Sequence, residues 1–437
     1  MPEIRPFRGL RFDAESVGDL AAVVAPPYDV IGTAEQERLL ARHERNVVRL
    51  DLPTGEPREE PDERYRRAAR TLAAWRSDGT LRKDPRPSIY AYEQVYRVPG
   101  SDLERTQRGF FGRLRIEPFG PDAGVRPHER TLEGPREDRY RLLRATGVNT
   151  SPVVGLYEDP TGASAAALET VAARPLDVEV FDDDGVRHRL WVVSAEGDPP
   201  AQELLAAAGR GAVTIADGHH RYETALRYRD ERRMSRSCEE DPAFDYLLML
   251  FLEATSQPLT VLPTHRVVLG LGGDAADGLR AGLGGLFDAR SADRSELEAT
   301  FGSGVEPGGA GRLGLWTRTG GAVLTARRGA FVAVGPAAGR EVRQLDVWLL
   351  GVALERACAL DADEVAAGGR LRYVKSAAEA IDLVNAGTDG ADAAFLLQPT
   401  PVASITAVAA AGEVMPQKST YFYPKALTGL VINPHEW

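Results

Sequence analysis

The sequence predicts an α+β protein built from more than one lobe. Its 437 residues exceed what one compact core usually holds, so two or three lobes are expected. Hydrophobic residues make up 43% of the chain and charged residues 27%, which is typical of folded globular proteins. Stretches with helical periodicity also alternate with stretches of β-like alternation along most of the chain. These three observations predict helices and strands packed into several compact units.

The first part of the chain is expected to contain helices and hairpins in mixed order. Thr33 is a suitable N-cap for a first helix, because Glu35 and Glu37 follow it. The predicted helices span residues 33–44, 62–78, 136–145, 201–209 and 220–232. The predicted strands are a hairpin at 88–98 and 108–117, a strand at 152–157, a second hairpin at 176–194 and a strand at 212–216.

The character of the chain changes after an apolar stretch at 244–262. Glycine is dense at 270–285 and 302–321, where "RLGLWT", "AVLTA" and "AFVAV" form short β-like runs. Helix–strand alternation resumes from residue 343. We therefore expect a catalytic region at 1–269, a glycine-rich inserted or appended subdomain at 270–340, and a C-terminal α/β region at 341–437.

The composition of the chain limits which partners and which cellular compartment are expected. The net charge of −11 disfavours general attraction to nucleic acid or to an anionic membrane, but it permits a local basic pocket for one small anion. No apolar stretch is long enough for a membrane-spanning helix, and the first residues lack a signal-peptide core. The two cysteines, Cys238 and Cys358, lack metal-like spacing, so a reducing cytoplasm is expected.

The strongest motif is "IADGHHRYETAL" at 215–226, where a predicted strand meets a predicted helix. A helix N-terminus with an adjacent Arg221 favours phosphate binding, and Gly218 permits close backbone approach. His219 and His220 can donate to phosphoryl oxygens or act as acid or base. Asp217 is a candidate for binding a divalent cation or orienting a hydroxyl group.

A purely structural interpretation of this motif is a helix that Asp217 caps, with both histidines exposed to solvent. Four polar residues in a row after an apolar strand favour the functional interpretation instead. Zinc is disfavoured, because neighbouring histidines on one turn rarely share a metal and no further ligands follow at suitable spacing.

Two other histidine motifs carry weaker signals. "RPHERT" places His128, Glu129 and Arg130 in one loop, where a glutamate beside a histidine is a workable general base. "LPTHR" ends an apolar run with His265 and Arg266, which are candidates for a second anion contact. A surface loop and a strand end that emerges into solvent are the respective alternatives.

The segment "QKSTYFYPK" near the C-terminus brings lysines and hydroxyl groups together. Lys418, Ser419, Thr420 and Lys425 favour an anion contact, but the upstream glycines of a P-loop are missing. No strand–GxGxxG–helix unit is present, so a dinucleotide fold is not predicted. By themselves, Tyr28, Asp29, Asn149 and Ser151 are typical of turns.

Taken together, the motifs resemble the DUF1015 family. The resemblance rests on "VVAPPYDVI", "PHERT", "NTSPVVGLY", "IADGHHRYETAL", "LPTHR" and "MPQKSTYFYPKALTGLV", in that order and spanning residues 5–432. The glycine-rich stretch at 270–340 carries none of these motifs. The "DGHHR" element also resembles the phosphate-binding motif of the ParB/sulfiredoxin-like superfamily, which includes free-serine kinases, and this implies a ParB/sulfiredoxin-like catalytic core with additional α/β lobes.

The resemblance implies phosphoryl transfer to the hydroxyl of free L-serine, giving O-phospho-L-serine. Inorganic pyrophosphate is the expected donor, with ADP or ATP as alternatives, and Mg²⁺ is the expected cofactor. The implied catalytic residues are Glu129, Asp217, His219 and His220, with Asp217 also as the metal ligand and Asp29 as an alternative base to Glu129. The implied phosphate-binding residues are Gly218, His219, His220, Arg221, His265, Arg266, Lys418 and Ser419. The implied substrate-binding residues are Tyr28, Asp29, His128, Asn149 and Ser151.

Two other functions remain open at this point. One is a ParB-like nucleotide-binding regulator, although no basic helix-turn-helix segment is evident. The other is a phosphatase or nuclease that uses the same histidine cluster. The sequence leaves the donor, the direction of the reaction, the general base and the oligomeric state undetermined.

Overall fold

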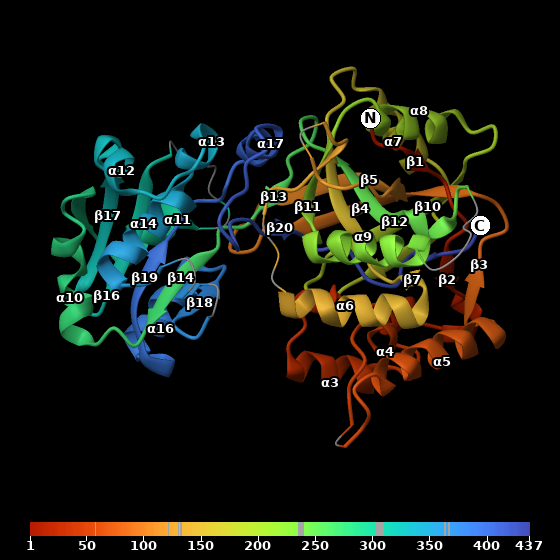
Figure 1. The fold of residues 1–437 in the computed structure, drawn as a ribbon, viewed down its shortest axis with the longest axis horizontal. Helices are drawn as coiled ribbons and strands as arrows, with labels where there is room; N and C mark the ends of the chain where they lie inside the picture. Colours follow the sequence, from red (N-terminus) through yellow and green to blue (C-terminus); the bar gives the residue numbers. More distant parts are fainter. Residues whose placement is uncertain are drawn as a thin grey trace.

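The chain forms two lobes that lie side by side (Figure 1). The computed structural model describes residues 1–56, 58–120, 122–129, 131, 133–234, 240–302, 304, 310–361, 364–365 and 368–437. Arg130 and Cys238, which the sequence singles out, lie outside these residues. Both chain ends belong to the same lobe, called here the N-terminal lobe.

A nine-stranded sheet forms the centre of the N-terminal lobe. Its strands pair mostly antiparallel, but β6 runs parallel to β11 and β8 runs parallel to β12. In spatial order the strands are β6 (Val125–Arg126), β11 (Val213–Asp217), β8 (Val153–Tyr157), β12 (Tyr246–Glu253), β5 (Glu104–Arg115), β4 (Ser88–Arg97), β10 (Arg187–Ser194) and β9 (Val178–Phe181), and β1 (Ile4–Arg5) pairs with β5.

Helices and irregular segments cover the two faces of this sheet. One face packs against α6 (Glu133–Thr146), α7 (Ala163–Ala172), α8 (Pro199–Gly209) and α9 (His219–Met234). The opposite face packs against residues near both chain ends, including Phe7, Leu427 and Val431. Every residue of β12 is buried, since both of its faces are covered.

A smaller layer of helices completes the N-terminal lobe. It contains α1 (Ala14–Val17), α2 (Leu20–Val23), the 3₁₀ turn η1 (Tyr28–Val30), α3 (Thr33–Arg42), α4 (Val48–Asp51), α5 (Glu63–Ser77) and the paired strands β2 (Leu10–Phe12) and β3 (Leu81–Lys83). Their apolar side chains form a separate small core around Leu39, Leu72 and Trp75. The N-cap position of α3 is Gly32 and not the expected Thr33, which begins the helix.

The second lobe, called here the C-terminal lobe, is built on an antiparallel six-stranded sheet. Its strands in spatial order are β15 (Phe287–Ala292), β17 (Gly320–Ala326), β16 (Arg312–Thr317), β19 (Ala391–Leu396), β14 (His265–Leu269) and β18 (Leu371–Val374). Its helices are α10 (Gly273–Gly282), α11 (Arg294–Phe301), α12 (Arg328–Val334), α13 (Arg340–Arg343), α14 (Asp346–Cys358), α16 (Ala377–Ala386) and α17 (Val402–Ala410), with a 3₁₀ turn η3 (Thr388–Gly390).

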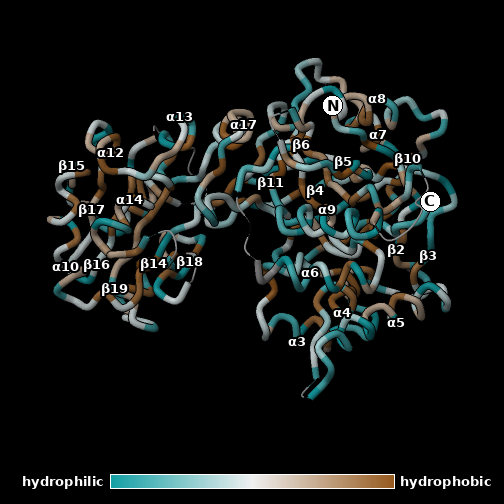
Figure 2. Tube along the Cα trace, in the orientation of Figure 1, coloured by the Kyte–Doolittle hydropathy of each residue, from teal (hydrophilic) through white to brown (hydrophobic). Residues whose placement is uncertain are grey.

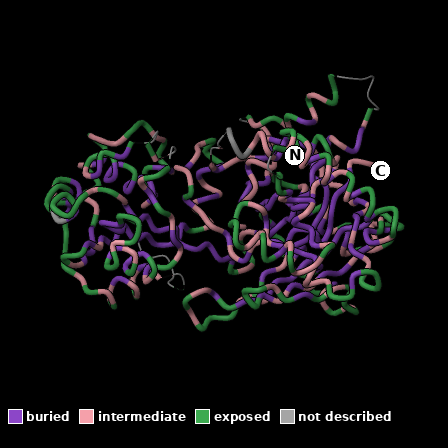
Figure 3. The backbone as a smooth tube through the Cα atoms, turned by 90° about the horizontal axis from the view of Figure 1, so that it is seen from below, coloured by how far each residue is buried: buried purple, intermediate pink, exposed green. Residues whose placement is uncertain are grey.

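Helices cover both faces of this second sheet, and apolar side chains alternate between the two faces along its strands. Val268 and Phe395 join the core that includes α10 and α14, whereas Val267 and Leu396 join the core that includes α11 and α16. Adjacent strand residues point to opposite faces, so each strand supplies both cores. Apolar segments accordingly run through the strands of both lobes (Figure 2), and the buried backbone is concentrated at their centres (Figure 3).

The second sheet crosses the expected domain boundaries. Strand β16 lies in the glycine-rich stretch and pairs with β19, which belongs to the expected C-terminal region. The expected separation of 270–340 from 341–437 is therefore replaced by one lobe whose sheet spans residues 265–396. The run "AFVAV" is part of helix α12 and not a strand, because Phe331 packs between Phe287 and Trp348. A short apolar run does not by itself distinguish a buried helix from a strand.

Two segments connect the lobes and pair with each other. Strand β13 (Thr260–Val261) leads out of the N-terminal lobe, and β20 (Phe422–Tyr423) leads back and lies antiparallel to it. The last strand, β21 (Asn433–Pro434), then pairs with β7 (Val148–Asn149) in the N-terminal lobe. The fold is thus mixed α/β, as the sequence predicts. Among the described residues, no helix has both the length and the apolar character needed to cross a membrane.

Candidate active site

The largest of the three cavities described here, of about 680 Å³, lies where the two lobes meet. We call the lining residues from 28–220 the N-terminal wall and those from 264–425 the C-terminal wall. The N-terminal wall contains Tyr28, Asp29, Val30, Glu129, Ala216, Asp217, Gly218, His219 and His220. The C-terminal wall contains Thr264, Leu269, Gly369, Leu371, Arg372, Tyr373, Lys375, Lys418, Thr420, Tyr421 and Lys425. The volume lies in the range of small-molecule sites.

The turn between β11 and α9 brings a helix N-terminus to this cavity. Asp217 ends the strand and His219 begins the helix, so only Gly218 separates them. Gly218 has φ +88°, and a Cβ atom there would lie 3.0 Å from the guanidinium group of Arg221. The first amides of a helix have no partner within it and carry partial positive charge. The end of α9 that lies at the cavity therefore has the polarity that favours an anion.

Asp217 is largely shielded from solvent and lies between two cationic side chains. Its Oδ1 accepts a hydrogen bond from Lys425, and its Oδ2 accepts one from Arg221 at 2.5 Å. Although burial opposes it, the charges of Lys425 and Arg221 lower the pKa of Asp217 well below its ordinary value. Asp217 is thus a carboxylate whose two oxygens are already engaged, and it holds the two cations in place.

The histidines of the site are held as neutral imidazoles. Nδ1 of His128 contacts the carbonyl of Ile215 and must donate there, so its Nε2 accepts from the hydroxyl of Thr420 at 3.0 Å. The backbone N–H of His128 donates to Nε2 of His219 at 3.3 Å. Burial lowers the pKa of His128 to about 4 and, together with His128, lowers that of His219 well below its ordinary value.

The loop around Lys418 closes the cavity against Glu129. The backbone N–H of Lys418 donates to Oε1 of Glu129 at 3.1 Å, and that of Met415 donates to the carbonyl of His128 at 2.8 Å. Burial raises the pKa of Glu129, and the neighbouring Lys418 opposes this change. Lys418 itself has φ +57°, a left-handed conformation that is uncommon for a residue other than glycine. Asp29, the other candidate base, is exposed.

Lysines converge around one aromatic ring on the C-terminal wall. The ammonium groups of Lys375 and Lys425 lie 3.6 and 4.3 Å from the ring centroid of Tyr421, within cation–π range. Burial, followed by the charges of Lys425 and Lys418, lowers the pKa of Lys375. With Arg372, this wall supplies four cationic side chains to the cavity. The N-terminal wall supplies the carboxylates Asp29, Glu129 and Asp217.

The cavity thus unites several residues expected from the sequence: Tyr28, Asp29, Glu129, Asp217, Gly218, His219, His220 and Lys418. His128 lies next to these residues and joins the N-terminal lobe to the returning segment through Thr420. Of the residues that carried no signal in the sequence, Lys375 and Arg372 stand out, because neither lies in any motif identified there. Lys425 lies in the "QKSTYFYPK" segment, and its contact with Asp217 becomes visible only in the structure.

The other expected site residues lie outside the cavity lining. His265 is buried in the C-terminal lobe, where its Nδ1 accepts from the backbone of Leu397. Ser419 donates to the carbonyl of Pro416. Asn149 accepts from the backbone of Leu248 at 3.1 Å and joins β7 to β21. These side chains support the structure around the site and do not face the large cavity.

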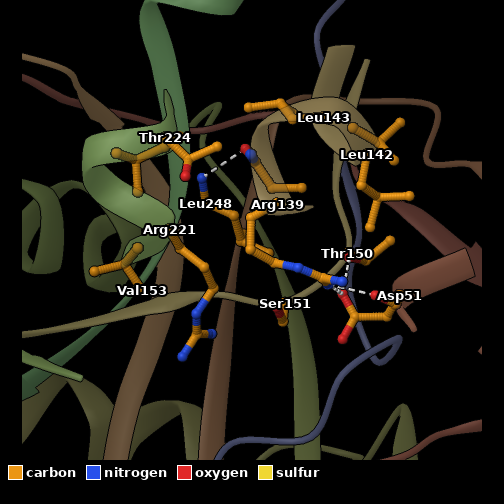
Figure 4. A pocket seen from close by; sticks show the side chains of 13 residues that line it. Asp51, Arg139, Leu142, Leu143, Thr150, Ser151, Val153, Arg221, Thr224 and Leu248 are labelled. Carbon is orange, nitrogen blue, oxygen red and sulfur yellow. Dashed lines mark hydrogen bonds and ion pairs between the residues drawn. The ribbon is translucent and has the colours of Figure 1, made fainter. Parts of the chain in front are cut away.

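Arg221 and Ser151 line a second, small cavity of about 50 Å³ behind the turn (Figure 4). Arg221 donates there to the carbonyl of Pro152, and Asp51 accepts from Thr150 at 2.6 Å. Arg139 lies 3.7 Å from Asp51, and its guanidinium group also lies 4.1 Å from the ring centroid of Tyr28. Arg221 is therefore engaged by Asp217 and by the main chain, and the expected fork onto phosphate oxygens needs a change in these contacts.

A metal ion held by protein side chains alone does not fit this site. Within the described part of the chain, no three His, Cys, Asp or Glu side chains form a group that could hold one. The two oxygens of Asp217 are paired with cations, which disfavours its expected role as a direct magnesium ligand.

A family model described as "Protein of unknown function (DUF1015)" matches residues 4–348, which is most of the chain. The chain belongs to the DUF1015 family. The family resemblance expected from the motifs is thereby confirmed. No curated protein matches the chain.

Several solved structures share a weak likeness with this DUF1015 protein. A free serine kinase in complex with AMP is 13% identical with a TM-score of 0.38, over 77% of this chain and 98% of that chain. A conserved hypothetical protein from Pyrococcus furiosus is 12% identical with a TM-score of 0.34, over 72% and 90%. SbnI with a C-terminal truncation, from Staphylococcus aureus, is 10% identical with a TM-score of 0.34, over 72% and 85%. Likenesses this weak carry no argument about fold or activity.

Proposed function

We propose that this protein is a small-molecule kinase that transfers a phosphoryl group to the hydroxyl of free L-serine, giving O-phospho-L-serine. One observation carries the proposal: a single cavity gathers the N-terminus of α9, four cationic side chains and a buried carboxylate. Phosphoryl transfer needs positive groups around the transferred phosphoryl and a base near the acceptor hydroxyl. This cavity offers both kinds of group within one space.

The donor is proposed to bind at the helix end. Its phosphate oxygens would accept hydrogen bonds from the first amides of α9 and face Lys418 and Lys425 across the cavity. Inorganic pyrophosphate is the donor expected from the family resemblance, and ADP or ATP are the alternatives. His219 and His220, which burial keeps largely neutral, can donate an N–H without adding charge.

Glu129 is the proposed general base. It would take the hydroxyl proton of serine while the serine oxygen forms a bond to phosphorus and the bond between phosphorus and the donor's bridging oxygen breaks. The leaving phosphate or nucleotide keeps that electron pair, and the lysines stabilise its charge. Burial raises the pKa of Glu129 toward neutral pH, where a base works best. Asp29 is the alternative base, since it also lines the cavity.

Magnesium is proposed only as a partner of the donor's phosphates. Mg²⁺ keeps several waters and binds mostly through substrate phosphates when few protein carboxylates are open to it. The ParB/sulfiredoxin-like relationship of the core, suggested by the "DGHHR" motif, also remains a proposal.

Product formation from purified protein tests the proposed function directly. The protein is incubated with L-serine, magnesium chloride and one donor at a time, namely pyrophosphate, ADP or ATP, and ³¹P NMR follows O-phospho-L-serine. The Lys425→Met variant should lose this product, while Arg294→Met, which removes a cation from the surface pair with Asp382, should not. No phosphoserine with any donor would contradict the proposal, and hydrolysis without an acceptor would favour a phosphatase.

A further inference from the structure

Arg266 is a buried cation whose two hydrogen bonds described in the structure both go to main-chain carbonyls. The residue is 5% exposed and lies on β14, next to the wall of the large cavity. Its Nη1 donates to the carbonyl of Thr264, and its Nη2 donates to the carbonyl of Lys418 at 2.9 Å. Among the described residues, no carboxylate lies within ion-pair distance of it. Burial lowers the pKa of Arg266 to about 10, and the charges of Tyr373 and Glu129 oppose this change only in part.

The aromatic ring of Tyr373 fixes the direction of this guanidinium group. Arg266 and Tyr373 are cross-strand neighbours on β14 and β18, and the guanidinium carbon lies 4.7 Å from the ring centroid. A planar guanidinium group can stack on a ring and still donate from its edge to two carbonyls. A lysine ammonium at the same place is a point charge and cannot reproduce this geometry.

The backbone of Lys418 is hydrogen-bonded to both lobes. Its N–H is held by Glu129 of the N-terminal lobe, and its carbonyl is held by Arg266 of the C-terminal lobe. Between these two contacts the backbone adopts φ +57°. A left-handed conformation at a residue with a side chain is strained and persists where surrounding contacts enforce it. These two hydrogen bonds are such contacts.

We propose that Arg266 is a positioning residue: by holding the carbonyl of Lys418 it fixes the backbone that presents the Lys418 ammonium group to the cavity, and it thereby sets the cavity's affinity for phosphate. This inference deepens the proposed function and rests on its phosphate site. It assigns Arg266 an indirect role, in place of the direct phosphate contact that the sequence motif implies. Besides the cations of Arg372 and Lys375, the C-terminal lobe then contributes to donor binding through the hydrogen bond from Arg266 to the main chain of Lys418.

Calorimetric titration with inorganic pyrophosphate, in the absence of serine, tests this inference. Lys418→Ala should weaken binding about 10- to 100-fold, the loss typical of a charge-assisted hydrogen bond. Arg266→Lys should weaken binding about tenfold although it keeps the charge, because it cannot hold both carbonyls. Arg294→Lys on the protein surface is the matched control and should leave the affinity unchanged.

A double-mutant cycle separates positioning from a direct effect of charge. If Arg266 acts through Lys418, then Arg266→Lys combined with Lys418→Ala should bind pyrophosphate within about twofold of Lys418→Ala alone. Additive losses, or wild-type affinity in Arg266→Lys, would overturn the inference. Lys418→Gly should bind like Lys418→Ala but melt at a higher temperature, since glycine adopts positive φ freely.

The two proposals fail in different ways. A wild-type protein that binds pyrophosphate but forms no phosphoserine would refute the kinase function and leave the positioning role in place. A wild-type protein that binds neither pyrophosphate, ADP nor ATP would refute both.

Discussion

The two walls of the central cavity are built in opposite ways. The N-terminal wall is dominated by one compact motif, in which a strand end, one glycine and a helix start place Asp217, His219 and His220 within a few residues, and the segments around Asp29 and Glu129 join it. The C-terminal wall draws its cations from separate places, with Arg372 and Lys375 at the edge of a sheet and Lys418 and Lys425 on the returning segment.

The two walls also differ in the charge of the side chains that they present to the cavity. The carboxylates that line the cavity belong to the N-terminal wall, and the lysines and the arginine belong to the C-terminal wall. Asp217 and Lys425 join the two walls by an ion pair, and Glu129 joins them by accepting the N–H of Lys418. Neither wall by itself holds both the carboxylates and the cations, so activity is expected to depend on the docking of the two walls against each other.

The largest effects on stability and activity are expected when the carboxylate that joins the two walls is removed. Asp217→Asn should lower the free energy of unfolding by about 3–5 kcal/mol and abolish activity, because it leaves two buried cations without their counter-ion. Urea denaturation measures the first effect. Asp230→Asn on the same helix removes only an exposed carboxylate and should change stability by no more than about 0.5 kcal/mol. Equal losses of stability in the two variants would contradict the role of Asp217 in joining the two walls.

The second prediction tests which carboxylate of the N-terminal wall acts as base. Glu129→Gln should lower kcat about 10²- to 10⁴-fold, the usual contribution of a general base, with a smaller change in KM. Asp29→Asn should have the smaller effect on kcat, because Asp29 is exposed at the cavity edge. Steady-state kinetics of phosphoserine formation provides the measurement, and a reversed order would transfer the role to Asp29.

A third prediction concerns pH and follows from the raised pKa of Glu129. The base must be ionised, so kcat/KM should fall with decreasing pH at values above the ordinary glutamate pKa of about 4.3. Stability should change in the opposite sense. Because the folded state binds this proton more tightly than the unfolded state, the stability contribution of Glu129 is present below its unfolded pKa and is lost as pH rises through its folded pKa.

Comparison with Glu129→Gln isolates this contribution. The difference in unfolding free energy between wild type and variant should shift across that pH window and become constant above it. A difference that does not change with pH would contradict the raised pKa.

The smallest expected effects are changes in stability when alanine replaces a glycine, either in the turn before α9 or in the C-terminal lobe. Gly218→Ala should destabilise the protein by about 1–2 kcal/mol, because φ is +88° and the new Cβ atom would crowd Arg221. Gly278→Ala lies within α10 with open space around it and should instead stabilise by about 0.5–1 kcal/mol. Thermal denaturation of both variants checks the signs, and destabilisation by Gly278→Ala would contradict the difference drawn between the two sites.

The contrast between the walls also explains how much of the site the sequence predicts. Asp217 to His220 are predicted together because a strand, a turn and a helix start are local features with local signals. The same holds for the hairpin of β4 and β5 and for helices α5 and α9, whose positions agree with the expected ranges. Lys375 carries no such signal, because it becomes a neighbour of Lys425 only when β18 takes its place in the second sheet.

By itself, the sequence determined the mixed α/β character, the DUF1015 motifs and the turn that opens the cavity, since each depends on residues close together in the chain. Only the tertiary structure decided that residues 265–396 share one sheet, that Arg266 holds the backbone of Lys418, and that Lys425 neutralises Asp217. The physical reason is that sheet pairing and buried ion pairs join residues distant in the chain, and their partners are chosen by burial and charge balance across the whole fold.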